Sequence, residues 1–159
     1  MPIPPQQTTY YKQVRFTTRL PNHFHYSPSH YWISEVSAGV YRVGFTKFAA
    51  RMLGDFVEIT YSVQSGDRVG AGDSLGSVEG FKAISEVYCV GEGIWVRGNP
   101  ELERQAELVD KDPYDQGWLY ELQGTASPEW LNVHQYIALL DATITKMLET
   151  EQSSQDQSC

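Results

Sequence analysis

The clearest pattern of apolar and polar positions lies at residues 57–63, where Val, Ile, Tyr and Val alternate with Glu, Thr and Ser. Successive side chains of a β-strand point to opposite faces, so this alternation predicts a strand with one buried and one wet face. We expect Val57, Ile59, Tyr61 and Val63 to face a common core.

Shorter segments of the same kind follow one another along the chain. Residues 31–33 and 40–45 predict a strand pair, with a turn at 37–39. Residues 94–96 and 118–122 predict two further strands. Turn residues recur every ~8–12 positions between such segments, which is typical of a small all-β barrel or sandwich. The expected fold class is therefore mainly β.

Between these strands the sequence predicts short helices. Thr46 suits an N-cap, an apolar face follows it, and Gly54 can end the helix, so residues 46–53 predict one short helix. Residues 101–108 predict a second, acidic helix, and residues 112–117 predict a tight loop. We expect both helices to be peripheral to the strands.

A hairpin at residues 78–87 carries the most informative lysine of the chain. Two β-like segments meet at Lys82, and Gly80 relaxes the backbone where the chain reverses. Glu79 and Glu86 place a carboxylate on each side of the lysine in sequence. A lysine at a turn often serves to keep an edge soluble. Its isolation from other lysines and the glycines that flank the hairpin also suit an amine held clear of the body for modification by another protein.

The two ends of the chain differ from this central domain, which we place at residues 21–124. Residues 1–20 are polar and proline-rich before they become weakly β-like, and we expect an extended arm that could pair with the domain edge. Residues 125–150 predict an amphipathic helix capped by Ser127, with its apolar stripe packed on the barrel or on a partner. Residues 151–159 are polar, and we expect a disordered tail.

Composition narrows the possible partners. The chain has 159 residues, 41% of them apolar, and a formal net charge of −8. This suits one domain with a real core. No apolar run approaches the ~20 residues that a membrane span needs, and no basic cluster suits nucleic acid or acidic lipid. We therefore expect protein or small-molecule partners, with no nucleic acid and no membrane.

The cysteines and the N-terminus bear on the compartment. Cys89 lies in an apolar strand-like run and Cys159 ends the polar tail, so we expect no disulfide between them and a reducing cytoplasm of the bacterial type. The N-terminus lacks the apolar segment of a secretory signal. Arg15 and Arg19 beside threonines are weakly similar to a transit peptide, so a mitochondrial location stays open.

Two further features could suggest ligand sites. His23, His25 and His30 are close in sequence, but no acidic or cysteine ligand stands beside them and a Ser-Pro turn separates the third. We therefore expect no metal site. Gly70 and Gly72 lack the third glycine, the following helix and the Lys-Ser/Thr pair of a phosphate-binding loop, so turns between short strands explain them better.

Several short motifs follow one another from about residue 26 to residue 122. They are Ser29-His30-Tyr31-Trp32, Val43-Gly44-Phe45-Thr46 followed by Leu53-Gly54-Asp55, Glu79-Gly80-Phe81-Lys82-Ala83, Asn99, and Asp112-Pro113-Tyr114 with Gly117-Trp118. In this order and spacing they resemble the H proteins of the glycine cleavage system, a family of lipoyl carriers.

The resemblance implies a lipoyl-type hybrid barrel-sandwich with a lipoyl group attached covalently to Lys82 at the hairpin tip. Glu79, Gly80 and Ala83 would form the local frame of this cofactor site. The chain would be no enzyme but a carrier component, because the dithiol of the cofactor does the chemistry. Its arm would shuttle an aminomethyl group between partner enzymes in glycine decarboxylation.

The resemblance also implies the partners and a cleft for the loaded arm. The partners would be glycine decarboxylase, a tetrahydrofolate-dependent aminomethyltransferase, dihydrolipoamide dehydrogenase and a lipoate-attaching enzyme. The candidate residues of the cargo cleft are Ser29, His30, Tyr31 and Glu86.

The chain departs from the family pattern at this implied cleft. Family members place a glutamate where this chain has Tyr31, and the Ser-Val before the lysine is Gly80-Phe81 here. Losing one of two carboxylates should weaken binding of an ammonium-like cargo by roughly 1–3 kcal/mol in a partly buried site. Two alternatives therefore stay open, namely an H-like lipoate-binding carrier of another pathway such as sulfur oxidation, and an interaction module without a lipoyl group.

Overall fold

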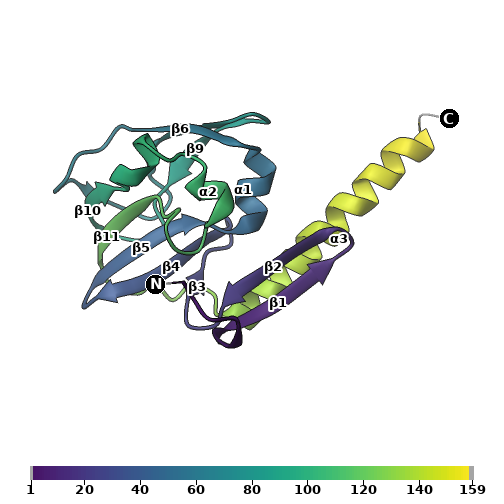
Figure 1. Ribbon diagram of the computed structural model, residues 1–159, viewed down its shortest axis with the longest axis horizontal. Coiled ribbons are helices and arrows are strands. Elements are labelled where there is room, and N and C mark those ends of the chain that lie inside the picture. The colour runs from purple at the N-terminus through teal and green to yellow at the C-terminus, as the bar shows by residue number, and fades with distance from the viewer. Residues whose placement is uncertain (1, 158–159) are drawn as a thin grey trace.

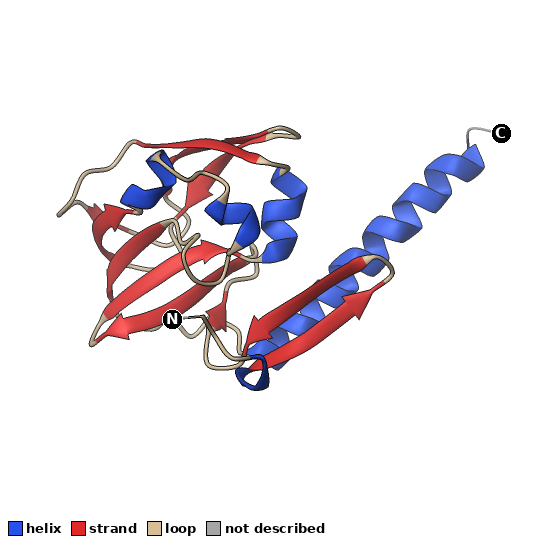
Figure 2. Cartoon of the chain, viewed as in Figure 1, coloured by secondary structure: helices blue, strands red, loops and turns tan. Residues whose placement is uncertain are grey.

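The computed structural model describes residues 2–157, with side chains described through residue 152. Most of its strands belong to two antiparallel sheets, which form the left-hand body in Figures 1 and 2. The strands of the larger sheet are β3 (His25–Tyr26), β4 (Tyr31–Ser37), β5 (Val40–Phe45), β7 (Arg68–Val69), β10 (Gly93–Gly98) and β11 (Tyr120–Gly124). Those of the smaller sheet are β6 (Phe56–Tyr61), β8 (Ser74–Gly80) and β9 (Ile84–Tyr88). The strand orders are β3-β4-β5-β11-β10-β7 and β6-β8-β9.

The main core lies between these two sheets. Val43 and Leu122 of the larger sheet are buried in the same apolar cluster as Leu75, Val78 and Val87 of the smaller sheet. Burial of such side chains supplies about 1.5–3 kcal/mol each, so this cluster is the main source of stability of the body. The expected mainly β class, with short peripheral helices and a C-terminal helix, is confirmed.

The alternating strand is found, with one correction. Ile59, Tyr61 and Val63 pack against the main core as expected, but Val57 is exposed and Phe56 is buried instead. The pairing of β6 with β8 shifts register between Phe56 and Glu58. A bulge of this kind adds a residue to one strand and reverses which face the following side chain takes, and a period-two pattern does not reveal it.

The short helix after β5 follows its prediction. Helix α1 spans Lys47–Leu53, the Thr46 side chain accepts a hydrogen bond from the Ala49 N–H, and Gly54 ends the helix with φ 83°. That φ lies in the region that favours glycine, which explains the stop.

The acidic segment after β10 differs from its prediction. Instead of one helix at 101–108 there is a 3₁₀ helix, η2 (Pro100–Glu103), and a separate short helix, α2 (Leu108–Lys111). The residues that η2 and α2 bury are Leu102 and Val109. Between the two helices the small, partly buried Ala106 is the apolar side chain that packs against the core, which is little to hold a continuous helix there. The last strand, β11, starts at Tyr120, two residues later than expected.

The N-terminal arm forms its own hairpin and does not pair with the domain edge. The strands β1 (Thr8–Gln13) and β2 (Phe16–Pro21), preceded by the short 3₁₀ helix η1 (Pro5–Gln7), pair with each other and lie alongside the C-terminal helix α3 (Val133–Gln157) in Figure 1. Apolar side chains explain this packing, since Phe16 and Leu20 are buried in one cluster with Tyr136 and Leu140 of the helix. This second core also includes Trp32 and Phe48 of the body.

Helix α3 begins later and ends later than predicted. Ser127 caps a turn through a hydrogen bond from the Glu129 N–H, but Leu131 then pairs with Tyr26 in an extended bridge. The helix can begin after this bridge, where Asn132 and Gln135 exchange side-chain-to-backbone hydrogen bonds in a capping box. Its far end projects beyond the body and continues to Gln157, so most of the expected disordered tail is helical.

Three smaller expectations concern the membrane and the cysteines. No helix among the described residues is both long enough and apolar enough to cross a bilayer. Cys89 is a buried free thiol. Cys159 lies outside the described residues.

Candidate functional site

Lys82 lies on the turn between β8 and β9, and its side chain is exposed. Three backbone hydrogen bonds fix the turn, from the Gly80 N–H to the Ala83 oxygen (2.9 Å), from the Phe81 N–H to the Asp55 oxygen (3.0 Å) and from the Lys82 N–H to the Leu53 oxygen (3.0 Å). The turn is therefore fastened to the end of α1, and the lysine stands on a rigid base.

Two glycines permit this close approach. A Cβ on Gly54 would come within 2.8 Å of Lys82 Cγ and of its backbone nitrogen. A Cβ on Gly80 would come within 2.4 Å of the Leu53 carbonyl oxygen. Real Cβ atoms do not approach backbone this closely, so both positions need glycine for the turn to lie against α1.

The Lys82 ammonium group has few partners. Its Nζ donates a long hydrogen bond of 3.4 Å to the Arg51 carbonyl oxygen. The ion pairs found in the described part of the chain join Arg42 and Arg97 to Glu121 and Arg104 to Glu101, and none of them involves Lys82. Neither Glu79 nor Glu86 forms an ion pair with Lys82. The lysine amine is therefore accessible to an acylating reagent or a modifying enzyme.

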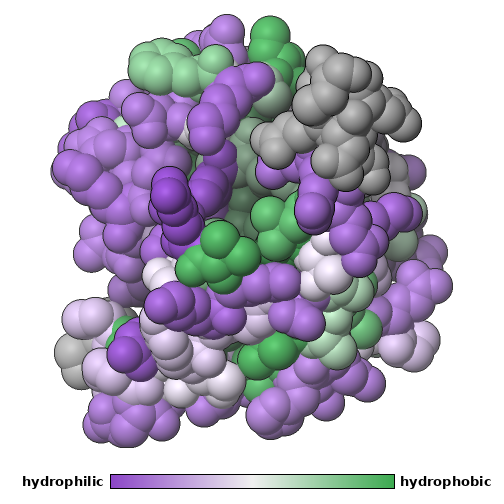
Figure 3. Space-filling model, turned by 90° about the vertical axis from the view of Figure 1, so that its right-hand side faces the viewer, coloured by the Kyte–Doolittle hydropathy of each residue, from purple (hydrophilic) through white to green (hydrophobic). Residues whose placement is uncertain are grey.

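A cleft of about 320 Å³ opens beside the turn, between β4, α1 and β9. All four predicted cargo-cleft residues lie in its lining, which they share with apolar residues of α1 that the sequence did not assign to the site. The lining consists of Ser29, His30, Tyr31, Phe45, Phe48, Ala49, Met52, Leu53, Ala83, Ser85, Glu86 and Tyr88. Figure 3 views the side of the molecule that lies on the right in Figure 1, where hydrophobic side chains (green) lie among hydrophilic ones around a hollow.

Tyr31 forms the inner wall of this cleft. It is 3% exposed, its ring stacks on Phe45 at 5.4 Å between centroids, and its hydroxyl oxygen accepts a hydrogen bond of 2.9 Å from the Tyr88 N–H. Burial raises the pKa of Tyr31 to about 12, so the hydroxyl is uncharged at neutral pH. Tyr31 thus presents a neutral, largely satisfied group to the cleft, at the position where the resemblance led us to expect a glutamate.

The other polar residues of the cleft differ in their exposure and in the hydrogen bonds that they already make. Ser29 Oγ shares a hydrogen bond of 3.0 Å with Ser27 Oγ. Glu86 is exposed on β9, and its hydrogen bond with the Tyr88 hydroxyl raises the pKa of that tyrosine. His30 has a φ of 72°, and its Nδ1 lies 2.8 Å from the Tyr136 hydroxyl oxygen. The carboxylate of Glu86 is therefore the negative charge that the cleft offers.

A second hollow, of about 370 Å³, lies on the other side of the turn. Lys82 and Phe81 line it together with Lys47, Arg51 and Asp110. The turn is thus a ridge between two hollows. Phe81 is 79% exposed and Ile84 is 74% exposed, so apolar side chains flank the lysine on its ridge.

His23, His25 and His30 do not form a metal site in the described part of the chain. Among the described residues, no group of three or more His, Cys, Asp or Glu side chains is placed to hold a metal ion. The His23 ring lies against Phe24 and the His25 ring near Trp130. His30 alone of the three lines the cleft.

Comparison with known proteins gives a consistent set of similarities. The family model described as glycine cleavage H-protein matches residues 24–148. The glycine cleavage system H protein of Corynebacterium jeikeium is 39% identical over 124 residues, which are 76% of this chain and 97% of that protein. The H protein of Cronobacter sakazakii is 34% identical over 131 residues, 82% of this chain and 96% of that protein.

A solved structure agrees with these sequences. The crystal structure of a glycine cleavage system H protein from Mycobacterium marinum superposes with a TM-score of 0.67 at 33% identity, and the match covers 75% of this chain and 97% of that chain. The family match begins after the β1–β2 hairpin and ends before the last turns of α3.

Proposed function

Because this chain belongs to the glycine cleavage H-protein family, we propose that it is a lipoyl carrier whose attachment site is Lys82. The observation that carries the proposal is the exposed Lys82 on a turn fastened by three backbone hydrogen bonds, beside a cleft with apolar walls. In this proposal the chain has no catalytic group of its own. Its partners are glycine decarboxylase, an aminomethyltransferase, dihydrolipoamide dehydrogenase and the enzyme that attaches lipoate.

The residues around Lys82 fit a lipoyl group. The absent side chain of Gly54 leaves room for the base of the lysine, and the amine faces solvent, where a modifying enzyme can reach it. The cleft of about 320 Å³ has a size suited to a small organic group, with walls from Phe48, Met52 and Leu53. The chemistry that lipoate supplies when bound is the reversible uptake of an aminomethyl group on sulfur.

The chain's own residues would position the lipoyl arm and shield the occupied cleft from water. The rigid turn keeps the anchor point of the arm constant, so visits to successive active sites become local swings with a high effective concentration. The apolar wall of α1 would exclude water from the occupied cleft. Glu86 and Ser29 would accept hydrogen bonds from a cationic amine, which prefers carboxylate and hydroxyl acceptors.

Lipoylation of Lys82 is the first test. Incubation of the unmodified full chain with a lipoate ligase, lipoate and ATP should add one lipoyl group, read by intact mass, and the Lys82→Arg variant should fold equally well and gain none. Lys47→Arg is the matched control, because Lys47 lines the hollow next to the same turn and should be dispensable. A mass gain in Lys82→Arg, or its loss in Lys47→Arg, would overturn the assignment.

A second candidate function deserves a place because of Tyr31. The hydroxyl of Tyr31 already accepts the Tyr88 N–H and brings no charge, so the cleft lacks one of the two carboxylates expected for an aminomethyl cargo. This observation favours a lipoyl carrier that serves another lipoate-dependent pathway. The lipoylated chain should then fail in glycine–bicarbonate exchange with glycine decarboxylase, whereas an aminomethyl carrier supports it.

A further inference from the structure

A short chain of hydrogen bonds runs behind the cleft, from α1 through α3 to His30. The Tyr136 hydroxyl lies 3.0 Å from Thr46 Oγ1 and 2.8 Å from His30 Nδ1. Thr46 Oγ1 also accepts a hydrogen bond of 3.4 Å from the Ala49 N–H as the N-cap of α1. Tyr136 is fully buried and stacks on Tyr26 at 4.8 Å between ring centroids, so its hydroxyl is held in place.

Which group donates in each of these hydrogen bonds follows from counting the available donors and acceptors. Thr46 is 1% exposed, and among the described residues Tyr136 Oη is the acceptor that its hydroxyl proton can reach. Turning that proton away would leave a buried donor unpaired, at a cost of about 1–3 kcal/mol. The Thr46 hydroxyl therefore donates to Tyr136, and the Tyr136 hydroxyl proton is left to donate to His30 Nδ1.

This direction decides the state of His30. A neutral imidazole that accepts at Nδ1 carries its proton on Nε2. Burial lowers the pKa of His30, which also favours the neutral ring at physiological pH. The backbone of His30 has a φ of 72°, rare for a residue with a side chain, and the His30 N–H and carbonyl groups bond Ser27 and Thr46. Such held strain is typical of residues with a positioning task.

We propose that Tyr136 is a positioning residue that fixes His30 as a neutral ring with its Nε2–H offered to the cleft, where it donates to a carbonyl oxygen of the group attached at position 82. His30 lines the cleft, and no described group hydrogen-bonds its Nε2. An N–H donor suits an uncharged acceptor and repels an ammonium group, so the amine of a cargo is left to Glu86 and Ser29. The proposal rests on the proposed function, because it takes the side chain at position 82 as the occupant of the cleft.

The state of His30 is tested on the full, unmodified chain by ¹⁵N-histidine NMR, with His30→Gln to assign its signals. The expected result is a neutral His30 with the proton on Nε2 at pH 7, and a mixture of tautomers in Tyr136→Phe. Tyr26→Phe is the matched control, since it removes a buried hydroxyl from the same stacked pair without touching His30. Thr46→Ser keeps the donating hydroxyl and should retain the tautomer.

Some results would overturn the positioning role. They are a proton on Nδ1 in the natural chain, a cationic ring at pH 7, or a tautomer that Tyr136→Phe leaves unchanged. Because Phe keeps the stacking on Tyr26, the variant should remain folded, and circular dichroism of the same samples checks this.

The contact with the arm is tested without any lipoylating enzyme. The Lys82→Cys variant alkylated with N-octyl iodoacetamide carries an amide carbonyl and an apolar chain at the same position. Exchange of the His30 Nε2–H with water should slow by roughly 2- to 10-fold relative to the same variant coupled to decyl methanethiosulfonate, which carries an apolar chain without a carbonyl, as one added hydrogen bond predicts. Unchanged exchange would sink the proposal. Failure of the carrier function is read separately, as the absence of a lipoyl mass on the natural chain.

Discussion

At the scale of single residues, Glu121 is the charge with the most ion-pair partners among the residues that the structure describes. Its carboxylate accepts hydrogen bonds from Arg42 at 3.0 Å and from Arg97 at 2.7 Å, and both guanidinium groups also lie over the Trp118 ring. Burial pushes the pKa of Glu121 upward, but the two arginines together outweigh it, and the pKa ends below its ordinary value. The network ties the neighbouring strands β5, β10 and β11 through one carboxylate.

Glu121→Gln should therefore destabilise the chain at neutral pH by about 1–3 kcal/mol, since it removes a charged acceptor from two donors. The carboxylate contributes stability above its unfolded-state pKa of about 4.5 and loses it as the pH falls through the lowered folded-state pKa, because the unfolded chain then binds the proton first. Urea unfolding of both proteins from pH 7 to pH 3 should show the difference shrinking. Glu101→Gln, in an exposed pair with Arg104, should change stability by no more than about 1 kcal/mol at any pH.

Within the proposed carrier function, Tyr31 is the residue that tests which cargo the cleft accepts. We predict that Tyr31→Glu raises the rate of glycine–bicarbonate exchange of the lipoylated chain, because a second carboxylate would join Glu86 in binding the amine. It should also lower the melting temperature, since the position is 3% exposed and a buried carboxylate is costly. Tyr31→Phe should lower the melting temperature slightly, by freeing the Tyr88 N–H, without raising the exchange rate. An exchange rate that is already high in the natural chain and unchanged in Tyr31→Glu would show that the tyrosine is no defect.

The sequence predicted the polar cleft residues that belong to short motifs, and it missed the apolar residues of α1 in the lining and Tyr136, which bonds His30. Ser29, His30 and Tyr31 are adjacent in the chain, and Glu86 lies in the same hairpin as the lysine. Tyr136 meets His30 across 106 positions, and its place in the chain matched an ordinary apolar helix stripe. A hydrogen bond between distant side chains leaves no periodic signal, so the fold has to be known before it can be found.

At the scale of elements, α3 gives the clearest prediction. Tyr136 and Leu140 are fully buried and Ile144 nearly so, in a cluster shared with the β1–β2 hairpin and Trp32. Each such side chain contributes about 1.5–3 kcal/mol when buried. Truncation at Gly124 should therefore lower the melting temperature strongly or cause aggregation, measured by calorimetry and size-exclusion chromatography.

A shorter truncation serves as the control for this experiment. Ending the chain after Thr150 removes the projecting end of α3 and keeps the buried stripe. Its melting temperature should match that of the full chain. If truncation at Gly124 also leaves the melting curve unchanged, burial of the apolar face of α3 does not stabilise the body.

Element boundaries show where local pattern stops being sufficient. The N-cap and glycine stop of α1 were predicted correctly because both signals are local. The start of α3 was predicted too early, since the bridge between Tyr26 and Leu131 holds the chain extended where Ser127 would otherwise begin a helix. The bulge beside Phe56 and the docking of the N-terminal hairpin likewise depend on partners that lie elsewhere in the chain.

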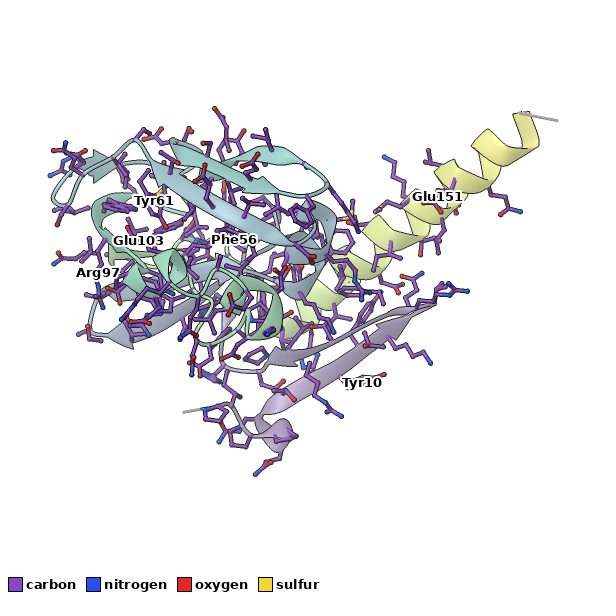
Figure 4. All side chains as sticks on the ribbon, turned by 45° about the horizontal axis from the view of Figure 1, so that its top comes forward. Tyr10, Phe56, Tyr61, Arg97, Glu103 and Glu151 are labelled. Carbon is purple, nitrogen blue, oxygen red and sulfur yellow. The ribbon has the colours of Figure 1, made fainter. Side chains whose placement is uncertain are left out.

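At the scale of the whole molecule, the cleft lies on the seam between two cores. Tyr31 and Phe45 belong to the core between the sheets, whereas Phe48 belongs to the core under α3 and the hairpin. Tyr61 and Arg97 lie at the end of the body away from Tyr10 and Glu151 (Figure 4), although the Arg97 guanidinium group still lies over the Trp118 ring of the second core. Substitutions in the second core should therefore alter the cleft more than substitutions at the far end of the body.

The docking of the first hairpin on the last helix has a consequence for synthesis on the ribosome. Tyr11 donates to Asp141 across 130 positions, and Phe16 and Leu20 are buried in the cluster that holds α3. Strands β1 and β2 leave the ribosome before helix α3, which packs on them, so their apolar face lacks this cover while the more than 100 residues between them are made. A chain released early can never cover it. Chaperones and proteases, which recognise exposed apolar segments, can thus distinguish a chain without α3 from a chain that contains it by the uncovered face of the β1–β2 hairpin.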